Sequence, residues 1–85
     1  MGAITVDYLK SAITERLDAT HVEVVDASGG CGQAFEVVIV SEQFQGKNKL
    51  FRHRLVNKAL QAEIQSIHAF TQKSYTPEEW QKLQK

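Results

Sequence analysis

The sequence contains one cysteine and one proline, and its acidic and basic residues balance to a formal net charge of zero. Because the single thiol, Cys31, has no partner within the chain, no disulfide can staple the fold, and a reducing compartment is expected. No apolar run approaches the roughly 18 residues of a membrane-spanning helix. The first residues also lack the basic and apolar regions of a secretory signal, so the sequence predicts a cytoplasmic protein.

The residue combinations that carry most enzyme chemistry are also absent. We find no nucleophile–base pair, no paired carboxylates in a cleft context and no phosphate-cradling loop of the Walker type. No metal motif is complete within the chain either. The sequence therefore predicts a single non-enzymatic domain over residues 1–85.

The zero net charge conceals an asymmetry along the chain. Residues 1–46 carry two basic and seven acidic residues, a net charge of −5, and residues 47–85 carry eight basic and three acidic residues, a net charge of +5. His53 is interpreted as part of a basic face. The basic residues of that face are Lys47, Lys49, Arg52, Arg54 and Lys58. The pattern fits a surface for an anionic partner, and it also fits a solvated helix face.

Local patterns predict one helix and two strands in the first half of the chain. A helix is expected over 6–18, where apolar residues recur at spacings of three and four. Strands are expected over 21–27 and 34–41, and the second is apolar on both faces, as in a central strand. The glycine-rich segment 28–33 predicts a hairpin loop that carries Cys31.

A long amphipathic helix is expected over 51–65, after a turn at Gly46 and a short helical turn at 47–50. Cations at the start of a helix are unfavourable by a few tenths of a kcal/mol each, a cost that a docked anion offsets. The side chains expected to be buried are Phe51, Leu55, Val56, Ala59, Leu60 and Ile64. The side chains expected in solvent are Arg52, Arg54, Asn57, Lys58, Gln61 and Gln65.

The last part of the chain predicts a strand over 67–74 and a short helix. The helix start is well marked, because Thr76 caps, Pro77 takes the first helical position and Glu79 completes a capping box. The apolar side chains of Trp80 and Leu83 are expected to anchor this helix.

The resulting order is α-β-β-α(α)-β-α, an α+β fold with a three-stranded mixed sheet and helices on one face. The first two strands are expected to form a hairpin. The second and third strands are joined through a helix, so they are expected to run parallel with a right-handed crossover.

Two residues are candidate metal ligands. Cys31 lies in the glycine-rich loop, where a thiol can be a ligand, a redox group or incidental. His68 lies at a helix-to-strand junction, where a histidine can equally be a packed or surface residue. Zinc and iron–sulfur sites take four ligands, so these two residues make at most half a site. If they bind metal, the other half must come from a second molecule.

Three motifs resemble the BolA family over about residues 5–82. They are F-x-G-K-x-x-L-x-R-H-R-x-V-N at 44–57, I-H-A at 67–69 and T-P-x-x-W at 76–80. The S-G-G-C-G loop resembles the eukaryotic cytosolic and nuclear branch, which partners monothiol (CGFS) glutaredoxins. The resemblance therefore extends the expected location to the nucleus.

The resemblance implies a class II KH-like fold and a role in iron–sulfur trafficking and iron regulation. It implies a heterodimer with a monothiol glutaredoxin, bridged by a [2Fe–2S] cluster. The glutaredoxin and its bound glutathione supply thiolates, and His68 and Cys31 supply the remaining ligands. A protonated imidazole cannot bind iron, so cluster binding is expected to weaken on acidification.

A nucleic-acid-binding regulator is the alternative function. KH domains grip single strands with a G-x-x-G loop, and the corresponding turn here, GKNKL at 46–50, has no second glycine. Binding through that loop is therefore in doubt. The basic helix still leaves DNA binding open.

Overall fold

The computed structural model describes residues 4–28 and 33–84. The α-helices and strands in these ranges are α1 (Val6–Leu17), β1 (His21–Asp26), β2 (Ala34–Val40), α2 (Lys49–Ala59), α3 (Gln61–Gln65), β3 (Ala69–Tyr75) and α4 (Pro77–Leu83). A short 3-10 helix, η1 (Glu42–Phe44), follows β2. In the described part of the chain, no helix has both the length and the apolar character needed to cross a membrane. The predicted element order is confirmed.

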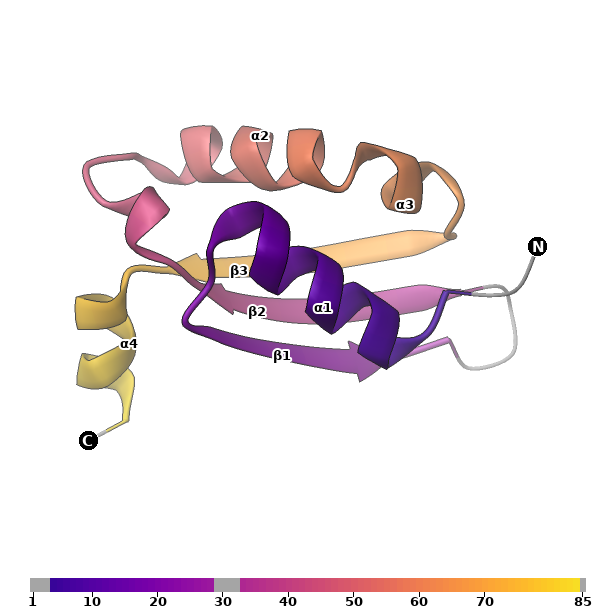
Figure 1. The fold of residues 1–85 in the computed structure, drawn as a ribbon, viewed down its shortest axis with the longest axis horizontal. Coiled ribbons are helices and arrows are strands. Elements are labelled where there is room, and N and C mark those ends of the chain that lie inside the picture. The colour runs from indigo at the N-terminus through magenta and orange to yellow at the C-terminus, as the bar shows by residue number, and fades with distance from the viewer. Residues whose placement is uncertain (1–3, 29–32, 85) are drawn as a thin grey trace.

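The three strands form one sheet in the order β1-β2-β3 (Figure 1). β1 and β2 pair antiparallel, and β2 and β3 pair parallel, with Val37 opposite both Val24 and Gln72. These findings confirm the predicted hairpin, the central position of β2 and the parallel return to β3. The predicted third strand began two residues too early, because Ser66 and Ile67 still donate to carbonyls of α3.

The core lies between one face of the sheet and helices α1 to α3. The predicted stripe of α1 is confirmed, since Leu9, Ala12, Ile13 and Leu17 are buried and the helix packs against β1 and α2. Alternate residues of the strands point to the same core. The buried core side chains include Leu9, Ile13, Leu17, Val22, Phe35, Val37, Ile39, Phe44, Val56 and Leu60. Burial of this apolar surface is the main stabilising contribution to the fold.

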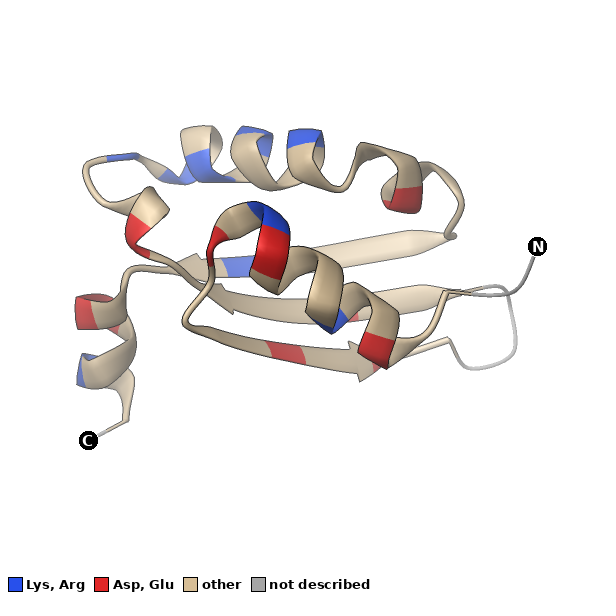
Figure 2. Cartoon of the chain, in the orientation of Figure 1, with Lys and Arg blue, Asp and Glu red and all other residues tan. Residues whose placement is uncertain are grey.

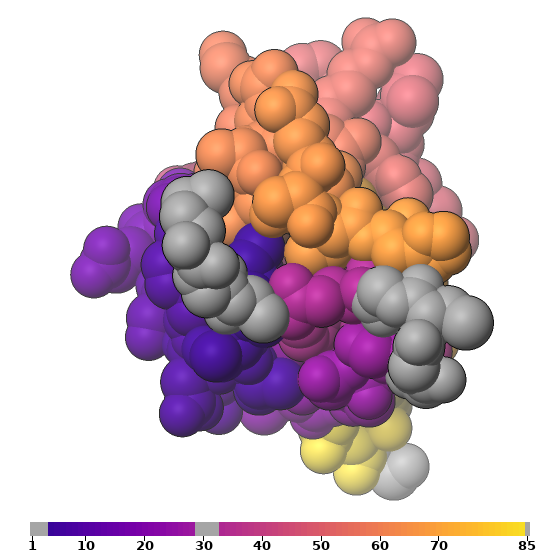
Figure 3. All heavy atoms as spheres, turned by 90° about the vertical axis from the view of Figure 1, so that its right-hand side faces the viewer, coloured from indigo at the N-terminus to yellow at the C-terminus, as the bar shows by residue number. Residues whose placement is uncertain are grey.

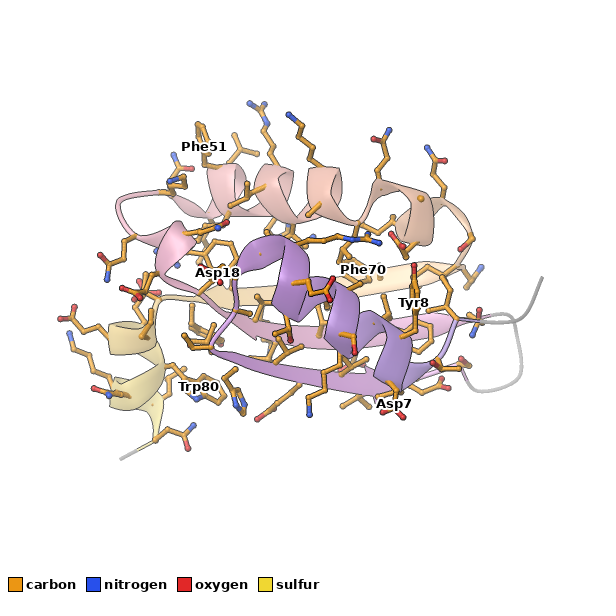
Figure 4. The ribbon with its side chains drawn as sticks, viewed as in Figure 1. Asp7, Tyr8, Asp18, Phe51, Phe70 and Trp80 are labelled. Carbon is orange, nitrogen blue, oxygen red and sulfur yellow. The ribbon has the colours of Figure 1, made fainter. Side chains whose placement is uncertain are left out.

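Helix α4 packs at one end of the sheet and reaches its other face. His21, Val40 and Tyr75 lie opposite one another in the register and so point to the face away from α1. The Trp80 ring stacks on His21, with 5.1 Å between centroids, and lies 5.5 Å from Tyr75. Trp80 therefore anchors α4 as predicted, and Figure 4 shows it beside the start of β1. Leu83 is exposed, so its predicted anchoring role is wrong.

The helix predicted over 51–65 is interrupted at Leu60. The backbone of Leu60 leaves helical geometry at φ −114° and ψ 24°, while its side chain is fully buried. Hydrogen bonds continue across the break, because Leu60 N–H donates to Val56 and Leu60 C=O accepts from Ile64. Neither glycine nor proline marks this position, so local sequence carries no signal for it.

Two residues at the start of α2 face opposite to the prediction. Phe51, expected in the core, is 56% exposed and points away from the sheet (Figure 4). The Arg52 side chain, expected in solvent, is only 11% exposed. Arg52 turns inward because it has partners inside the molecule, and the predicted buried and exposed positions from Arg54 onward are confirmed.

The turn before α2 is built from local backbone chemistry. Gly46 adopts φ +73°, a left-handed conformation that glycine reaches without strain. Asn48 then caps α2, its side chain accepting from the Phe51 N–H at 2.9 Å. Phe44, two residues before Gly46, is fully buried and anchors the start of the turn in the core. This turn positions the basic residues that follow it.

Candidate functional site

His68 lies between the end of α3 and the first residue of β3, as predicted. Its side chain is exposed, and no described residue forms a hydrogen bond or ion pair with the imidazole. Its backbone N–H donates to the carbonyl of Gln33 at 2.6 Å, and the N–H of Ala69 donates to the same carbonyl at 3.2 Å. The backbone of His68 is therefore fixed, and among the described residues no side chain occupies either ring nitrogen.

Gln33 was not singled out by the sequence, yet it connects three segments. Its carbonyl receives the bonds from His68 and Ala69. Its side-chain amide donates to the Ile4 carbonyl at 2.7 Å and accepts from the Ile4 N–H at 3.1 Å. Figure 3 views this end of the molecule, where the orange segment after α3 lies beside the magenta start of β2. Gln33 thus ties the hairpin base to the histidine.

The other side of the hairpin base is also fixed. The Asp26 carboxylate accepts from the N–H of Ser28 at 2.9 Å, and the Ser28 hydroxyl accepts from the N–H of Ala34 at 3.2 Å. Hydrogen bonds from Ser28 lower the pKa of Asp26 below its usual value. Cys31 lies outside the described residues, but Gln33, two positions later, contacts His68 directly. Gln33 and Ser28, the described residues on either side of this segment, therefore lie at the same end of the sheet as His68.

A buried carboxylate fixes α3, which leads to His68. Glu63 accepts two bonds from Arg16, at 2.8 and 3.1 Å, and one from the Tyr8 hydroxyl at 2.6 Å. Figure 4 shows Tyr8 rising from α1 toward α3. The Arg16 hydrogen bond, with a further contribution from Tyr8, lowers the pKa of Glu63 to about 2, despite the opposing effect of burial. Arg16 also donates to the Ala59 carbonyl at 3.0 Å, at the break between α2 and α3.

Arg52 holds the opposite end of the molecule together. Its guanidinium donates to the carbonyls of Phe44, Lys47 and Ser74 at 2.9–3.3 Å. It also forms a two-bond ion pair with Glu79, at 2.8 and 3.3 Å, which lowers the pKa of that carboxyl. An anion was expected to dock near the start of α2. For Arg52, this anion is the carboxylate of Glu79 in the same chain. The expectation that Arg52 lies on a solvated binding face is wrong.

The remaining basic residues form an exposed face on α2. Blue segments follow the outer side of this helix in Figure 2. Lys49, Arg54 and Lys58 are exposed, and Lys47 is half-buried. Leu50 and Phe51 are exposed among them, at 60% and 56%. A surface that mixes cations with exposed apolar side chains is typical of a contact region for another macromolecule.

His53 lies one helical turn after Lys49, on the side of this face that borders β3. It is exposed, but it lines a groove that runs along β3 toward His68. Within the described residues, no three histidine, cysteine, aspartate or glutamate side chains gather in a way that could hold a metal ion. The described geometry therefore offers His68 as one accessible ligand and not as part of a complete site.

The fold and the site define an α+β domain that presents an exposed histidine at the start of β3 and a basic face on α2. The family model described as BolA-like protein matches residues 13–79. The chain belongs to the BolA family.

Several eukaryotic relatives match most of the chain. "Protein BOLA2" of Arabidopsis thaliana is 49% identical, covering 91% of this chain and 84% of its own. "BolA-like protein 2" of Homo sapiens is 45% identical and covers 91% of each chain. "BolA-like protein 3" of Homo sapiens matches only 59% of this chain, at 46% identity. The similarity over most of the chain is thus to proteins of the BolA2 type.

Solved structures agree with this assignment. A bol-like protein from Babesia bovis superposes with a TM-score of 0.89 at 43% identity, covering 99% of this chain and 98% of its own. The solution structure of yeast Fra2 gives a TM-score of 0.75 at 49% identity, covering 94% and 87%. Family membership and the similarity to BolA2-type proteins support an adaptor role.

Proposed function

We propose that the chain supplies His68 and Cys31 as its share of the ligands of a [2Fe–2S] cluster. The cluster is held jointly with a monothiol glutaredoxin and its bound glutathione, and the pair acts in iron–sulfur trafficking and iron regulation in the cytoplasm and nucleus. The observation that carries the proposal is the bond from the His68 N–H to the Gln33 carbonyl. This bond fixes the backbone of a residue with an exposed imidazole, and its Gln33 end lies two positions from Cys31 along the chain.

The donor set fits a shared cluster better than a site within one chain. A cluster needs four ligands, and this chain offers one nitrogen and one sulfur. An imidazole in place of a thiolate leaves the cluster less negative, which raises its reduction potential. Gln33 keeps the His68 backbone in place, and the Glu63 network holds α3 immediately before it.

Cluster assembly with and without the imidazole tests the proposal. The chain is mixed with a monothiol glutaredoxin, glutathione, iron and sulfide, and visible absorption and circular dichroism are recorded. His68→Ala is expected to lower the yield of the heterodimeric cluster by at least about tenfold. His68→Cys is expected to keep the cluster but lower its reduction potential, because a thiolate adds negative charge.

The matched control is His21→Phe. It removes an exposed imidazole from the opposite end of the sheet and keeps a ring against Trp80. A cluster spectrum that is the same for wild type and His68→Ala contradicts the ligand assignment. A complex that forms equally well without iron and sulfide would indicate an adaptor that needs no metal. Cys31→Ala is expected to weaken the cluster less than His68→Ala.

A second candidate function is nucleic-acid binding through the exposed face of α2. The observation that favours it is Phe51, which lies exposed among Arg54 and Lys58, because aromatic and basic side chains together bind single strands.

Binding to single-stranded and duplex DNA tests this candidate. Contacts from Lys49, Arg54 and Lys58 to phosphates are expected to make the affinity fall steeply with salt. The double variant Arg54→Glu, Lys58→Glu is expected to abolish binding, and the double variant Lys10→Glu, Lys82→Glu, on α1 and α4, is the charge-matched control. An absence of binding even at low salt excludes this function.

A further inference from the structure

Strand β3 has one free edge, and a groove runs along it. Within the described residues, β3 pairs only with β2. Two adjoining hollows, of about 260 and 410 Å³, share His53 and Gln72. Together they form one groove, here called the edge groove, from Lys49 beside Tyr75 to His68. Its walls come from α2 and the segment after α3, and its floor is the edge of β3.

The backbone of β3 presents hydrogen-bonding groups to this groove. The Ala69 N–H donates to Gln33, and the Tyr75 carbonyl accepts from Ser41, so these residues turn their polar groups toward β2. In a parallel pair the direction alternates, so the polar groups of Phe70, Gln72 and Ser74 face the free edge.

The bond on Ser74 supports this orientation, because Arg52 of α2 donates to its carbonyl at 3.3 Å. The N–H and C=O groups of Phe70 and Gln72 have no such partner among the described residues. A strand edge of this kind is a template for pairing with another extended chain.

Two side chains on the same strand are also incompletely satisfied. The Gln72 amide donates to Asn57 on α2 at 2.9 Å, but its oxygen is buried without a partner among the described residues. The Ser74 hydroxyl oxygen is in the same situation. Because these two atoms have almost no accessible surface, an incoming chain would meet the backbone of β3 and not these side-chain oxygens.

The two ends of the edge groove differ in chemistry. At the Tyr75 end, Lys49 and Lys73 line the groove, and neither forms an ion pair with a described residue. At the His68 end, the lining includes the half-buried apolar side chains of Ile64, Ile67 and Phe70. Among the residues that the structure describes, no aspartate or glutamate lines either hollow. The groove therefore suits a chain with acidic side chains at one end and apolar side chains at the other.

We propose that the edge groove binds an extended, acidic peptide segment of a partner protein as a fourth strand beside β3. Its carboxylates meet Lys49 and Lys73, and its apolar side chains contact Ile64 and Ile67. A peptide backbone supplies the N–H donors that the carbonyls of Phe70 and Gln72 require, whereas a phosphodiester backbone has none. This binding needs no iron and does not depend on the proposed cluster.

Binding of a synthetic peptide tests the inference directly. The probe is a fluorescent octapeptide, long enough to span β3, with two acidic residues toward one end and two valines toward the other, spaced by threonines. It is made in both sequence orders, because the structure allows a parallel or an antiparallel strand. The order that binds more tightly is then N-methylated at every second residue, in two versions. The version that removes the N–H donors facing β3 is expected to bind at least about tenfold more weakly. The version that removes the N–H groups pointing away from β3 is expected to bind as well as the unmodified peptide.

Variants of the chain locate the site. Lys49→Glu with Lys73→Glu is expected to weaken binding about tenfold, and Lys10→Glu, on α1 and outside the groove, is expected to have no effect. Gln72→Pro removes an N–H that faces the free edge, a position where proline is tolerated, and is expected to abolish binding. Circular dichroism of each variant checks that the fold is kept.

Three outcomes overturn the inference. One is the absence of peptide binding to the folded wild type at low salt. Another is equal binding of the two N-methylated peptides, which excludes strand pairing. The third is displacement of the peptide by single-stranded DNA, together with an equal loss of affinity for both ligands in the Lys49→Glu, Lys73→Glu variant. This result would assign the groove to nucleic acid. None of these outcomes bears on the cluster, which is tested separately at His68.

Discussion

Single residues in this protein join elements that are distant in the sequence. Arg16 connects α1 to α3 through Glu63, and Arg52 connects α2 to α4 through Glu79. Both guanidinium groups also donate to backbone carbonyls. A guanidinium has five N–H donors, so it can enter a protein when carbonyls and one carboxylate receive them. Periodicity assigns every arginine to solvent, and it cannot detect a partner that is distant in the sequence.

Glu63 is expected to make stability depend on pH in the acid range. Its pKa is lowered from 4.5 to about 2, so its contribution is complete above about 4.5 and is lost as the pH falls toward 2. Glu63→Gln is expected to lower the free energy of unfolding by about 2 kcal/mol at neutral pH, because Arg16 and Tyr8 lose a charged acceptor. Urea denaturation at several pH values measures this difference.

The difference in the free energy of unfolding between wild type and Glu63→Gln is expected to shrink as the pH falls from about 4.5 toward 2, because the wild-type carboxylate becomes protonated. Glu15→Gln, at an exposed position of α1, is the control and is expected to change stability little at any pH. A Glu63→Gln penalty that stays constant down to about pH 2 contradicts the assignment of the stabilisation to the ionised carboxylate.

At the level of elements, the tie between α2 and α4 depends on Arg52. Arg52→Met is expected to lower the free energy of unfolding by about 2 kcal/mol, because three backbone carbonyls and one carboxylate lose their donor. Glu79→Gln is expected to cost less, because Glu79 is 45% exposed and its capping bonds to Thr76 remain.

A double-mutant cycle between Arg52→Met and Glu79→Gln isolates the ion pair. The expected coupling is between about 0.5 and 1 kcal/mol, as for a partly exposed pair. The matched control is Arg54→Met, because Arg54 is an exposed arginine two positions after Arg52. This variant is expected to show no coupling to Glu79. Strict additivity of Arg52→Met and Glu79→Gln contradicts a stabilising ion pair.

Elements that depend on local chemistry were predicted well. The capping box of α4 is present as expected, with Thr76 and Glu79 exchanging both bonds. The strands were predicted because alternation and β-branched residues mark them directly. The break at Leu60 was not predictable, because it coincides with a bond from Arg16 to the Ala59 carbonyl that only the assembled fold provides. Its neighbours in sequence give no sign of it.

Over the whole molecule, topology followed from connection lengths and chirality. A hairpin and a helical crossover leave few alternatives for three strands, and the observed order is the expected one. His68 could be singled out because its motif is specific. Gln33 could not, because it acts through its backbone carbonyl and through an amide bound to the Ile4 backbone. The edge groove likewise appears only when α2 and β3 are placed together.

The bond between His68 and Gln33 joins two main-chain atoms, so it can form with any residue at position 33 and with any residue except proline at position 68. Substitutions at residue 33 can loosen the contact to Ile4 while the tie to His68 persists. Lengthening or recomposing the hairpin tip likewise leaves both strand ends, and therefore the histidine, in register. The tip can consequently diversify in length and chemistry during evolution, and adapt to new partners, while the imidazole keeps its place.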